Sequence, residues 1–289
     1  MEVRCWCVTL IIKEQGSLID SGIYDILDRR EPNLPNFHIP TTHPRARSLF
    51  VRKMLVEGYK RGLVVPEGLI AHGRGEAFDY LLGETTSSVA RVAIRAASSS
   101  LMLSRCPVIS VNGNLVTLCA KAIVELSQLV GAKIEVNLFY RTNKREQLIR
   151  KELRNFGATE ILGMSLTQDS IIPELQSERR RVDPNGIMRA DTVLVPLEDG
   201  DRTEALVKMG KTVVAIDLNP MSRTARSADI TIVDNVIRTL PIMVAMVKKL
   251  KGIRRGYRNK VLRKAVGQFD NRTNLLKSES IMRGNSVRK

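Results

Sequence analysis

Short apolar runs alternate with amphipathic segments through the second half of the chain. The apolar runs predict strands within PVISVNGN, KIEVNLFYRT, TEILG, DTVLVPLEDGD, KTVVAIDLNP and ADITIVDN. The segments between and after them predict helices in LVTLCAKAIVELSQLVGA, NKREQLIRKELRNFGA, RTEALVKMG and VIRTLPIMVAMVKKL, the last of which we expect to be the final regular helix. Gly131 and Gly157 mark two helix ends. Strands that alternate with helices predict an α/β fold, a parallel sheet with helices on both faces.

The chain before residue 107 has a helical pattern. Helices are expected in HPRARSLFVRKMLVEGYKRGL and SSVARVAIRAASSSLMLSR. Between them, HGRGE (His72 to Glu76) predicts a glycine-rich turn that presents backbone amides and Arg74 to an anion at the start of a helix. PNLPNFHIP resembles a linker. We therefore expect an N-terminal extension (1–38), a helical N-terminal part carrying the HGRGE turn (39–106), a nucleotide and substrate domain (107–250) and a basic C-terminal helix or tail (251–289).

Charge is concentrated at one end of the chain. The 289 residues have a net charge of +16, but Lys248 to Lys289 alone contain 14 Lys and Arg against 2 Asp and Glu. The rest is nearly balanced, so nucleic acid is not expected as the main partner, although the tail could touch RNA or be a solvated segment. Residues 1–38 and the segment beyond about Arg272 are expected to be dispensable for catalysis, because the tail has few large apolar residues to bury.

Several classes of protein and site are excluded by what the sequence does not contain. It has no apolar run as long as a membrane span and no secretory cleavage pattern, which predicts a cytoplasmic protein without a membrane partner. Four Cys and three His lack the spacing of a zinc site. Gly210-Lys211-Thr212 resembles the end of a phosphate-binding loop, but Ala205 replaces the required glycine and the segment follows a helix. No nucleophile elbow is present, so ATP-driven chemistry on anions fits better than covalent catalysis.

Polar side chains follow the predicted strands where each strand ends. In an open parallel sheet these ends share one edge, where ligands bind. Arginine suits phosphate groups, whereas Asp and Asn suit ribose hydroxyls, adenine edges or hydrated Mg²⁺. We therefore predict a binding site at this edge, made by Asn112, Asn114, Asn137, Tyr140, Arg141, Glu198, Asp199, Asp201, Arg202, Asp217, Asn219, Arg223, Arg226, Asp234 and Asn235.

Long motifs from about residue 39 to 250 resemble the archaeal phosphopantothenate synthetase (4-phosphopantoate–β-alanine ligase) family. They include IPTTHPRARSL, GLIAHGRGEAFDYLLGE, PVISVNGN, KIEVNLFYRT, SERRRVDPNGI and DTVLVPLEDGDRTEALVKMGKTVVAIDLNPMSRTARSADITIVDN. The resemblance implies a Rossmann-like fold, a homodimer and a role in coenzyme A biosynthesis. It also implies that ATP activates the carboxylate of (R)-4-phosphopantoate as an acyl adenylate. β-Alanine then attacks, giving 4′-phosphopantothenate, AMP and pyrophosphate.

The resemblance and the strand-end pattern together nominate site residues. For ATP they are Arg52, Arg74, Asp217, Leu218, Asn219, Arg223, Thr224, Asn235 and Val236. For the other substrates we expect Asn112, Asn114, Asn137 and Arg141, and for catalysis Arg74, Glu76 and Asp199. Mg²⁺ is expected to accompany ATP, but the sequence does not identify its ligands. Glu76 has two interpretations, a carboxylate that orients Mg²⁺ or an amine, and a helix charge favoured by the dipole.

Two alternatives to this ligase stay open. One is an RNA-binding protein that uses the basic tail, which would show a steep dependence of affinity on salt. The other is an AMP-forming ligase of the same fold that acts on a different acid.

Overall fold

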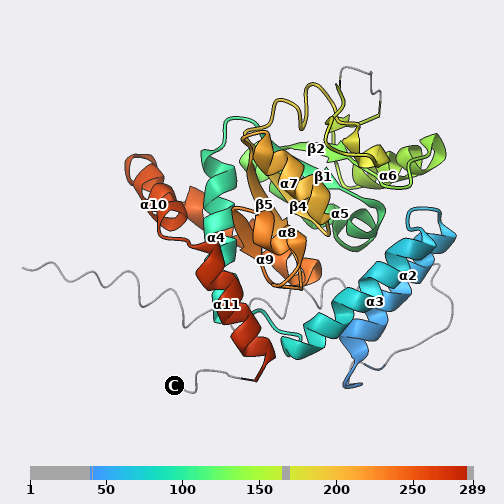
Figure 1. Ribbon diagram of the computed structural model, residues 1–289, viewed down its shortest axis with the longest axis horizontal. Helices are drawn as coiled ribbons and strands as arrows, with labels where there is room; N and C mark the ends of the chain where they lie inside the picture. The colour runs from blue at the N-terminus through green and yellow to red at the C-terminus, as the bar shows by residue number, and fades with distance from the viewer. Residues whose placement is uncertain (1–39, 41, 165–169, 285–289) are drawn as a thin grey trace, which may run out of the picture. The chain divides into compact units, whose positions relative to one another are not determined.

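The computed structural model describes residue 40 and residues 42–164 and 170–284 (Figure 1). The expected N-terminal extension lies outside these residues. From Arg47 onward the described residues belong to one compact unit. Within this unit α4 (Ser88–Leu103) packs against α9 (Val236–Lys251) and α10 (Arg255–Gly267). These contacts join three of the parts that the sequence analysis separated at residues 106 and 250. The separation therefore stays a prediction about the functions of those parts.

All six described strands run parallel, in the order β3-β2-β1-β4-β5-β6. Their bounds are β1 Pro107–Val111, β2 Lys133–Val136, β3 Ile161–Leu162, β4 Thr192–Pro196, β5 Thr212–Ile216 and β6 Ile230–Ile232. The α/β fold and its Rossmann-like sheet are thus confirmed. This strand order reverses between β1 and β4, which leaves a crevice above their carboxyl ends.

Helices cover both faces of this sheet (Figure 1). On one face α4, α9 and α5 (Gly113–Val130) pack together, and α6 (Asn143–Asn155) packs on α5. On the other, Val193, Val195, Val213 and Ala215 form a buried core with Leu206 of α7 (Gly200–Lys208). Because side chains alternate along a strand, these strands are buried on both faces, as their unbroken apolar runs predict. Among the described helices α5 is long and apolar enough to cross a membrane, but half of it is buried, as in a core helix.

The HGRGE segment departs from the sequence prediction. It is not a turn that opens a helix, because it lies inside α3 (Pro66–Leu81), which begins at Pro66, six residues before His72. Proline suits the first turn of a helix, where its missing N–H is not needed. Neither Gly73 nor Gly75 has a positive φ, so both are ordinary helical residues that cost roughly 1 kcal/mol each relative to Ala. Packing of the buried face of α3 offsets that cost.

The basic C-terminal segment is also more ordered than expected, since α10 and α11 (Asn271–Met282) follow the predicted last helix. Asn271 donates to the Ala225 carbonyl (3.0 Å) and accepts from the Thr231 amide (2.9 Å). Asn274 donates to the Thr231 carbonyl (2.8 Å). These bonds satisfy backbone groups of the edge strand β6. Leu275, Ile281 and Met282 also pack against the small core of Leu82, Leu218 and Val233, which contradicts the expectation that this segment buries little.

Candidate functional site

A cavity of about 620 Å³ opens at the carboxyl edge of the sheet, with α3 forming one wall. It lies where the strand order reverses, at the point where open α/β sheets bind ligands. Thirteen of the predicted site residues line it, namely Arg74, Asn112, Asn114, Tyr140, Glu198, Asp199, Asp217, Leu218, Asn219, Arg223, Thr224, Asn235 and Val236. The lining does not include the other predicted residues, Arg52, Glu76, Asn137, Arg141, Asp201, Arg202, Arg226 and Asp234.

The β5 end of the cavity carries the carboxylate of Asp217. This group accepts from the Asn219 amide (2.9 Å) and from the Ser222 hydroxyl. Burial raises the pKa of Asp217, while these two bonds favour the charged form. The loop therefore fixes an acceptor carboxylate at the strand end, the position at which sheets of this order bind ribose hydroxyls.

Asn235 lies between β6 (Ile230–Ile232) and α9, and it fastens α3 to the sheet. Its side-chain oxygen accepts from the Ile237 amide (3.2 Å) at the start of α9, and its nitrogen donates to Asp79 Oδ2 (2.8 Å) on α3. Arg238 bonds the same Asp79 (2.5 and 3.1 Å) and also Asp234 (2.5 and 2.9 Å). This buried network holds the helix that carries Arg74 against the β6 end of the sheet.

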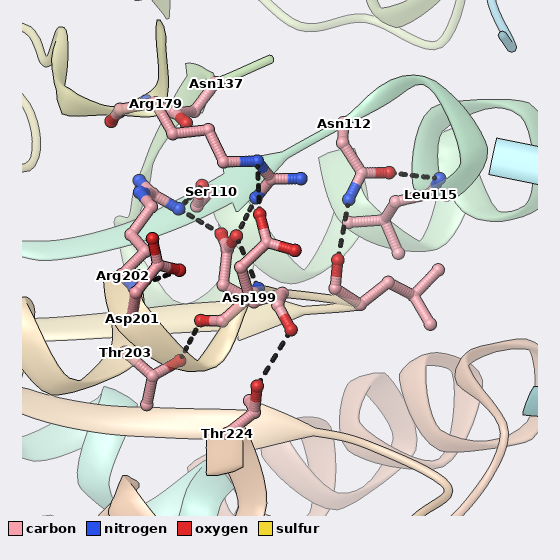
Figure 2. A network of polar contacts seen from close by, with 12 residues as sticks. Ser110, Asn112, Leu115, Asn137, Arg179, Asp199, Asp201, Arg202, Thr203 and Thr224 are labelled. Carbon is pink, nitrogen blue, oxygen red and sulfur yellow. Dashed lines mark hydrogen bonds and ion pairs between the residues drawn. The ribbon is translucent and has the colours of Figure 1, made fainter. Parts of the chain in front are cut away.

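The β4 end holds a second buried charge network, centred on Glu198 (Figure 2). Arg179 and Arg202 both contact the Glu198 carboxylate, and Arg202 also donates to Ser110 Oγ (3.1 Å). Arg179 Nε lies 3.0 Å from Asp199 Oδ2. Burial lowers the pKa of both arginines to about 10. Nε and Nη2 of Arg202 have no hydrogen-bond acceptor in the described part of the chain, whereas Nη1 and Nε of Arg179 form ion pairs with Glu198 and Asp199.

Two of the predicted arginines face the cavity from exposed positions. Arg74 of α3 makes no hydrogen bond or ion pair with the described residues, so its guanidinium is available to a ligand. Arg223, the first residue of α8 (Arg223–Ser227), pairs with Glu204 through two 2.9 Å bonds. The pair raises the pKa of Arg223 and lowers that of Glu204. Arg223 must therefore leave or share Glu204 to bind an anion.

The predicted residues outside the cavity lining bond to other protein groups. Arg52 Nε lies 2.8 Å from Glu76 Oε2. Burial alone would raise the pKa of Glu76, but hydrogen bonds from Arg52 and Tyr80 outweigh it and the pKa is lowered. Asn137 donates to two carbonyls of the 178–181 segment, and Arg141 bonds Glu146 (2.5 Å) and the Gly163 carbonyl (2.9 Å). Catalytic or substrate-binding roles for these residues stay predictions.

Sequence reasoning did not name Arg145 and Arg179, although both line the cavity. Arg179 belongs to the charged run SERRR, which was the available signal. Arg145 does not follow a predicted strand, because it lies in the first turn of α6. The strand-end pattern therefore did not include it. Among the described residues no group of three or more His, Cys, Asp and Glu side chains could hold a metal ion.

Comparison with known proteins identifies close relatives over most of the chain. The model of the phosphopantothenate/pantothenate synthetase family matches residues 89–285. The 4-phosphopantoate–β-alanine ligase of Thermococcus kodakarensis is 53% identical over 235 residues, which are 81% of this chain and 88% of the relative. The protein of the same name from Methanosarcina mazei is 48% identical over 243 residues, 84% of this chain and 92% of the relative.

Proposed function

Because the chain belongs to the phosphopantothenate/pantothenate synthetase family, we propose that it is an ATP-dependent ligase of coenzyme A biosynthesis. It joins (R)-4-phosphopantoate to β-alanine and releases AMP and pyrophosphate. The observation that carries this proposal is the cavity at the strand-order reversal, which is lined by cations from four separate segments (Arg74, Arg145, Arg179 and Arg223). Such a lining suits a reaction in which every substrate is an anion or carries a carboxylate.

Adenylation requires two anions to meet. A carboxylate oxygen attacks the α-phosphorus of ATP, and the bond to pyrophosphate breaks. In the proposal Asp217 accepts a ribose hydroxyl, while Arg74 and Arg223 neutralise the phosphates and the departing pyrophosphate. Asn235 and Val236 line the nucleotide side of the cavity.

Amide formation follows at the same carbon. The ammonium group of β-alanine first gives one proton to water, the free amine attacks the acyl carbon, the bond to AMP breaks, and the nitrogen loses a second proton to water. Asp199 lines the cavity at the start of α7, and its carboxylate is about half exposed. We assign it to the ammonium group of β-alanine, which it would attract and orient before attack.

Mg²⁺ is expected to enter with ATP. The described residues offer it no cage of three protein side chains, and Mg²⁺ commonly keeps water and phosphate ligands together with one or two carboxylates. Because Asp199 and Asp217 have the ammonium and ribose roles given above, water and phosphate oxygens would supply most of the ligands of the ion. Bound there, the ion would offset phosphate charge.

We extend the proposal to a cytoplasmic homodimer. Large apolar side chains are exposed on α2 (Ala46–Lys60) and α3, including Val56 (41%), Tyr59 (47%) and Ile70 (68%). Exposed apolar groups of this kind are typical of interfaces between copies of one chain. Cys106 and Cys119 are free thiols, as suits a reducing compartment. Light scattering of the purified protein tests the dimer, and a monomer mass at micromolar concentration would contradict it.

The function is tested by incubating the purified protein with ATP, 4-phosphopantoate and β-alanine and measuring products by mass spectrometry. We expect phosphopantothenate and AMP in equal amounts. ADP and phosphate in place of AMP would contradict the adenylate mechanism, and product from another acid but not from phosphopantoate would favour the alternative ligase. Arg74→Ala should lose activity, whereas Arg95→Ala, on the exposed side of α4, serves as the matched control.

A further inference from the structure

Arg145 is a buried cation whose recorded bonds all go to neutral groups. Its residue exposure is 8%, its Nε donates to the Leu63 carbonyl (2.9 Å) and its Nη1 donates to the Tyr140 carbonyl (2.8 Å). No carboxylate forms an ion pair with it among the described residues. A buried charge without a counter-charge is costly, so its retention beside a cavity points to a charge that arrives from outside.

The amino end of α5 meets the same guanidinium. Asn112 caps this 18-residue helix by accepting from the Leu115 amide (3.0 Å), and the amides of Gly113 and Asn114 have no recorded acceptor in the described chain. A Cβ on Gly113 would lie 2.7 Å from Arg145 Nη2, so the third guanidinium nitrogen lies against the first turn of the helix. The positive end of a helix dipole and a guanidinium repel each other unless an anion lies between them.

Arg179 adds a third positive group at this place. It lines the same cavity, and Arg145 is close enough to lower its pKa. Burial lowers the pKa of Arg145 as well, whereas Glu67 of α3 raises it. Arg179 is partly neutralised, because its Nη1 pairs with Glu198 and its Nε with Asp199. Two arginines and a helix amino end thus converge on one side of the cavity.

The geometry points to a phosphate-binding subsite formed by Arg145, Arg179 and the amino end of α5. We propose, resting on the function proposed above, that it binds the phosphate monoester of the acid substrate. A nucleotide phosphate has the same chemistry and is the other possible source. The acid substrate is favoured because Asp217 and Asn235, the groups suited to the nucleoside, follow β5 and β6, whereas the amino end of α5 and Arg145 follow β1 and β2, and Arg179 pairs with Glu198 after β4. β4 separates the two pairs of strands.

The test measures binding of three ligands by calorimetry, so that it does not depend on turnover. The ligands are 4-phosphopantoate, unphosphorylated pantoate and ATP, and the proteins are wild type, Arg145→Lys and Arg179→Lys. Arg150→Lys, on the same helix α6 and outside the cavity lining, is the matched control. Thermal unfolding of each variant, followed by circular dichroism, verifies that it is folded at the binding temperature.

We expect Arg145→Lys to weaken 4-phosphopantoate binding by about 10- to 100-fold, because lysine cannot keep both carbonyl bonds and still present a donor to the phosphate. Affinity for ATP and for pantoate should change by less than about 3-fold. Arg179→Lys should produce the same pattern, and Arg150→Lys should change none of the three.

Three results would overturn the inference. Loss of affinity mainly for ATP would assign the subsite to the nucleotide. Equal loss for 4-phosphopantoate and pantoate would show that Arg145 only positions the Tyr140 segment. Unchanged affinities in both folded variants would show that no phosphate reaches these arginines. If wild type binds 4-phosphopantoate and ATP but forms no amide, the proposed function fails while the subsite is still tested by the variants.

Discussion

Two buried arginine networks lie at the carboxyl edge of the sheet, one after β4 and one after β6, and they differ in how completely their polar atoms are bonded. Every guanidinium nitrogen of Arg238 donates to Asp79 or Asp234. The Thr86 hydroxyl also donates to Asp234 Oδ2 (2.6 Å). Around Glu198 the bonding is less complete, since Nε and Nη2 of Arg202 have no acceptor in the described residues, while Nη1 and Nε of Arg179 form ion pairs with Glu198 and Asp199. Both networks are buried, so burial alone does not show which of them has a structural role and which binds a ligand.

The difference separates a structural role from a binding role. A fully bonded buried network makes one arrangement of the chain rigid, because any other leaves charges unpaired. The second network also reaches the ligand site, because Arg179, Glu198 and Asp199 line the cavity, whereas Arg238, Asp79 and Asp234 do not. We therefore interpret the Arg238 network as a fastening for α3 and the Glu198 network as part of the site.

The largest expected effect is on folding, from Arg238→Met. It leaves Asp79 and Asp234 buried without a counter-charge, so the free energy of unfolding should fall by about 3–5 kcal/mol. Urea unfolding at pH 7 measures this, with Arg255→Met on the exposed side of α10 as control. A loss below about 1 kcal/mol would contradict the structural role.

Arg179→Gln should have the opposite effect to Arg238→Met, because it should lower catalytic activity much more than the free energy of unfolding. Removing a donor that faces the reacting anions should cost roughly 2–4 kcal/mol of transition-state stabilisation, or about 30- to 1000-fold in kcat/KM. The loss of unfolding free energy should be smaller than for Arg238→Met, because Glu198 would still form its ion pair with Arg202. A folding defect as large as that of Arg238→Met, with kcat/KM preserved, would make the two networks equivalent.

Glu135, close to Arg202, makes the second network sensitive to pH. Burial raises the pKa of Glu135 to about 7, although the amides of Asp183 (3.0 Å) and Ile187 (2.6 Å) donate to it. Since the folded pKa exceeds the unfolded value, the folded state binds the extra proton, and stability falls as pH rises from about 4.5 to about 7. The expected loss is roughly 2–3 kcal/mol.

Urea unfolding between pH 4.5 and 7.5 tests this for wild type and Glu135→Gln. Other carboxylates titrate in both proteins, so the difference between the two curves isolates Glu135. Parallel curves would show that this carboxyl titrates at its ordinary pKa.

At the nucleotide end, Asp217→Asn should weaken ATP binding by about 10-fold, because one ribose acceptor becomes a donor. Binding of 4-phosphopantoate should be unchanged, since its proposed subsite lies beyond β4. Calorimetry with each ligand separately measures both affinities. A larger loss for 4-phosphopantoate would show that Asp217 belongs to the binding site of the acid substrate and not to that of the nucleotide.

The smallest effect is expected from Glu204→Gln. Its partner Arg223 has a side chain that is 63% exposed, and exposed ion pairs contribute little to stability because water and salt screen them. The melting temperature should move by at most a few degrees, while ATP binding tightens slightly as Arg223 is released. A marked loss of ATP affinity would instead show that Glu204 positions Arg223.

Local pattern was sufficient for the sheet and for one half of the site. Each strand was predictable because a strand buried on both faces needs an unbroken apolar run, and Gly131 stopped its helix with a positive φ of 72°. Asp217 and Asn235 could be nominated because a parallel sheet brings consecutive strand ends to one edge whatever the details of packing. These features depend on residues close together in sequence or on a general rule of topology.

Tertiary structure alone decided the rest. HGRGE lies within a helix whose start at Pro66 is a local signal, but α3 is fixed in place because Asp79 is held by Asn235, 156 residues away. Arg145 entered the cavity because it bonds Leu63, 82 residues earlier, across a glycine at position 113 that leaves room for it. The basic tail docked because Asn271 and Asn274 meet an unpaired strand edge. Such contacts join residues whose separation no local pattern encodes, so they exist only once the chain has folded.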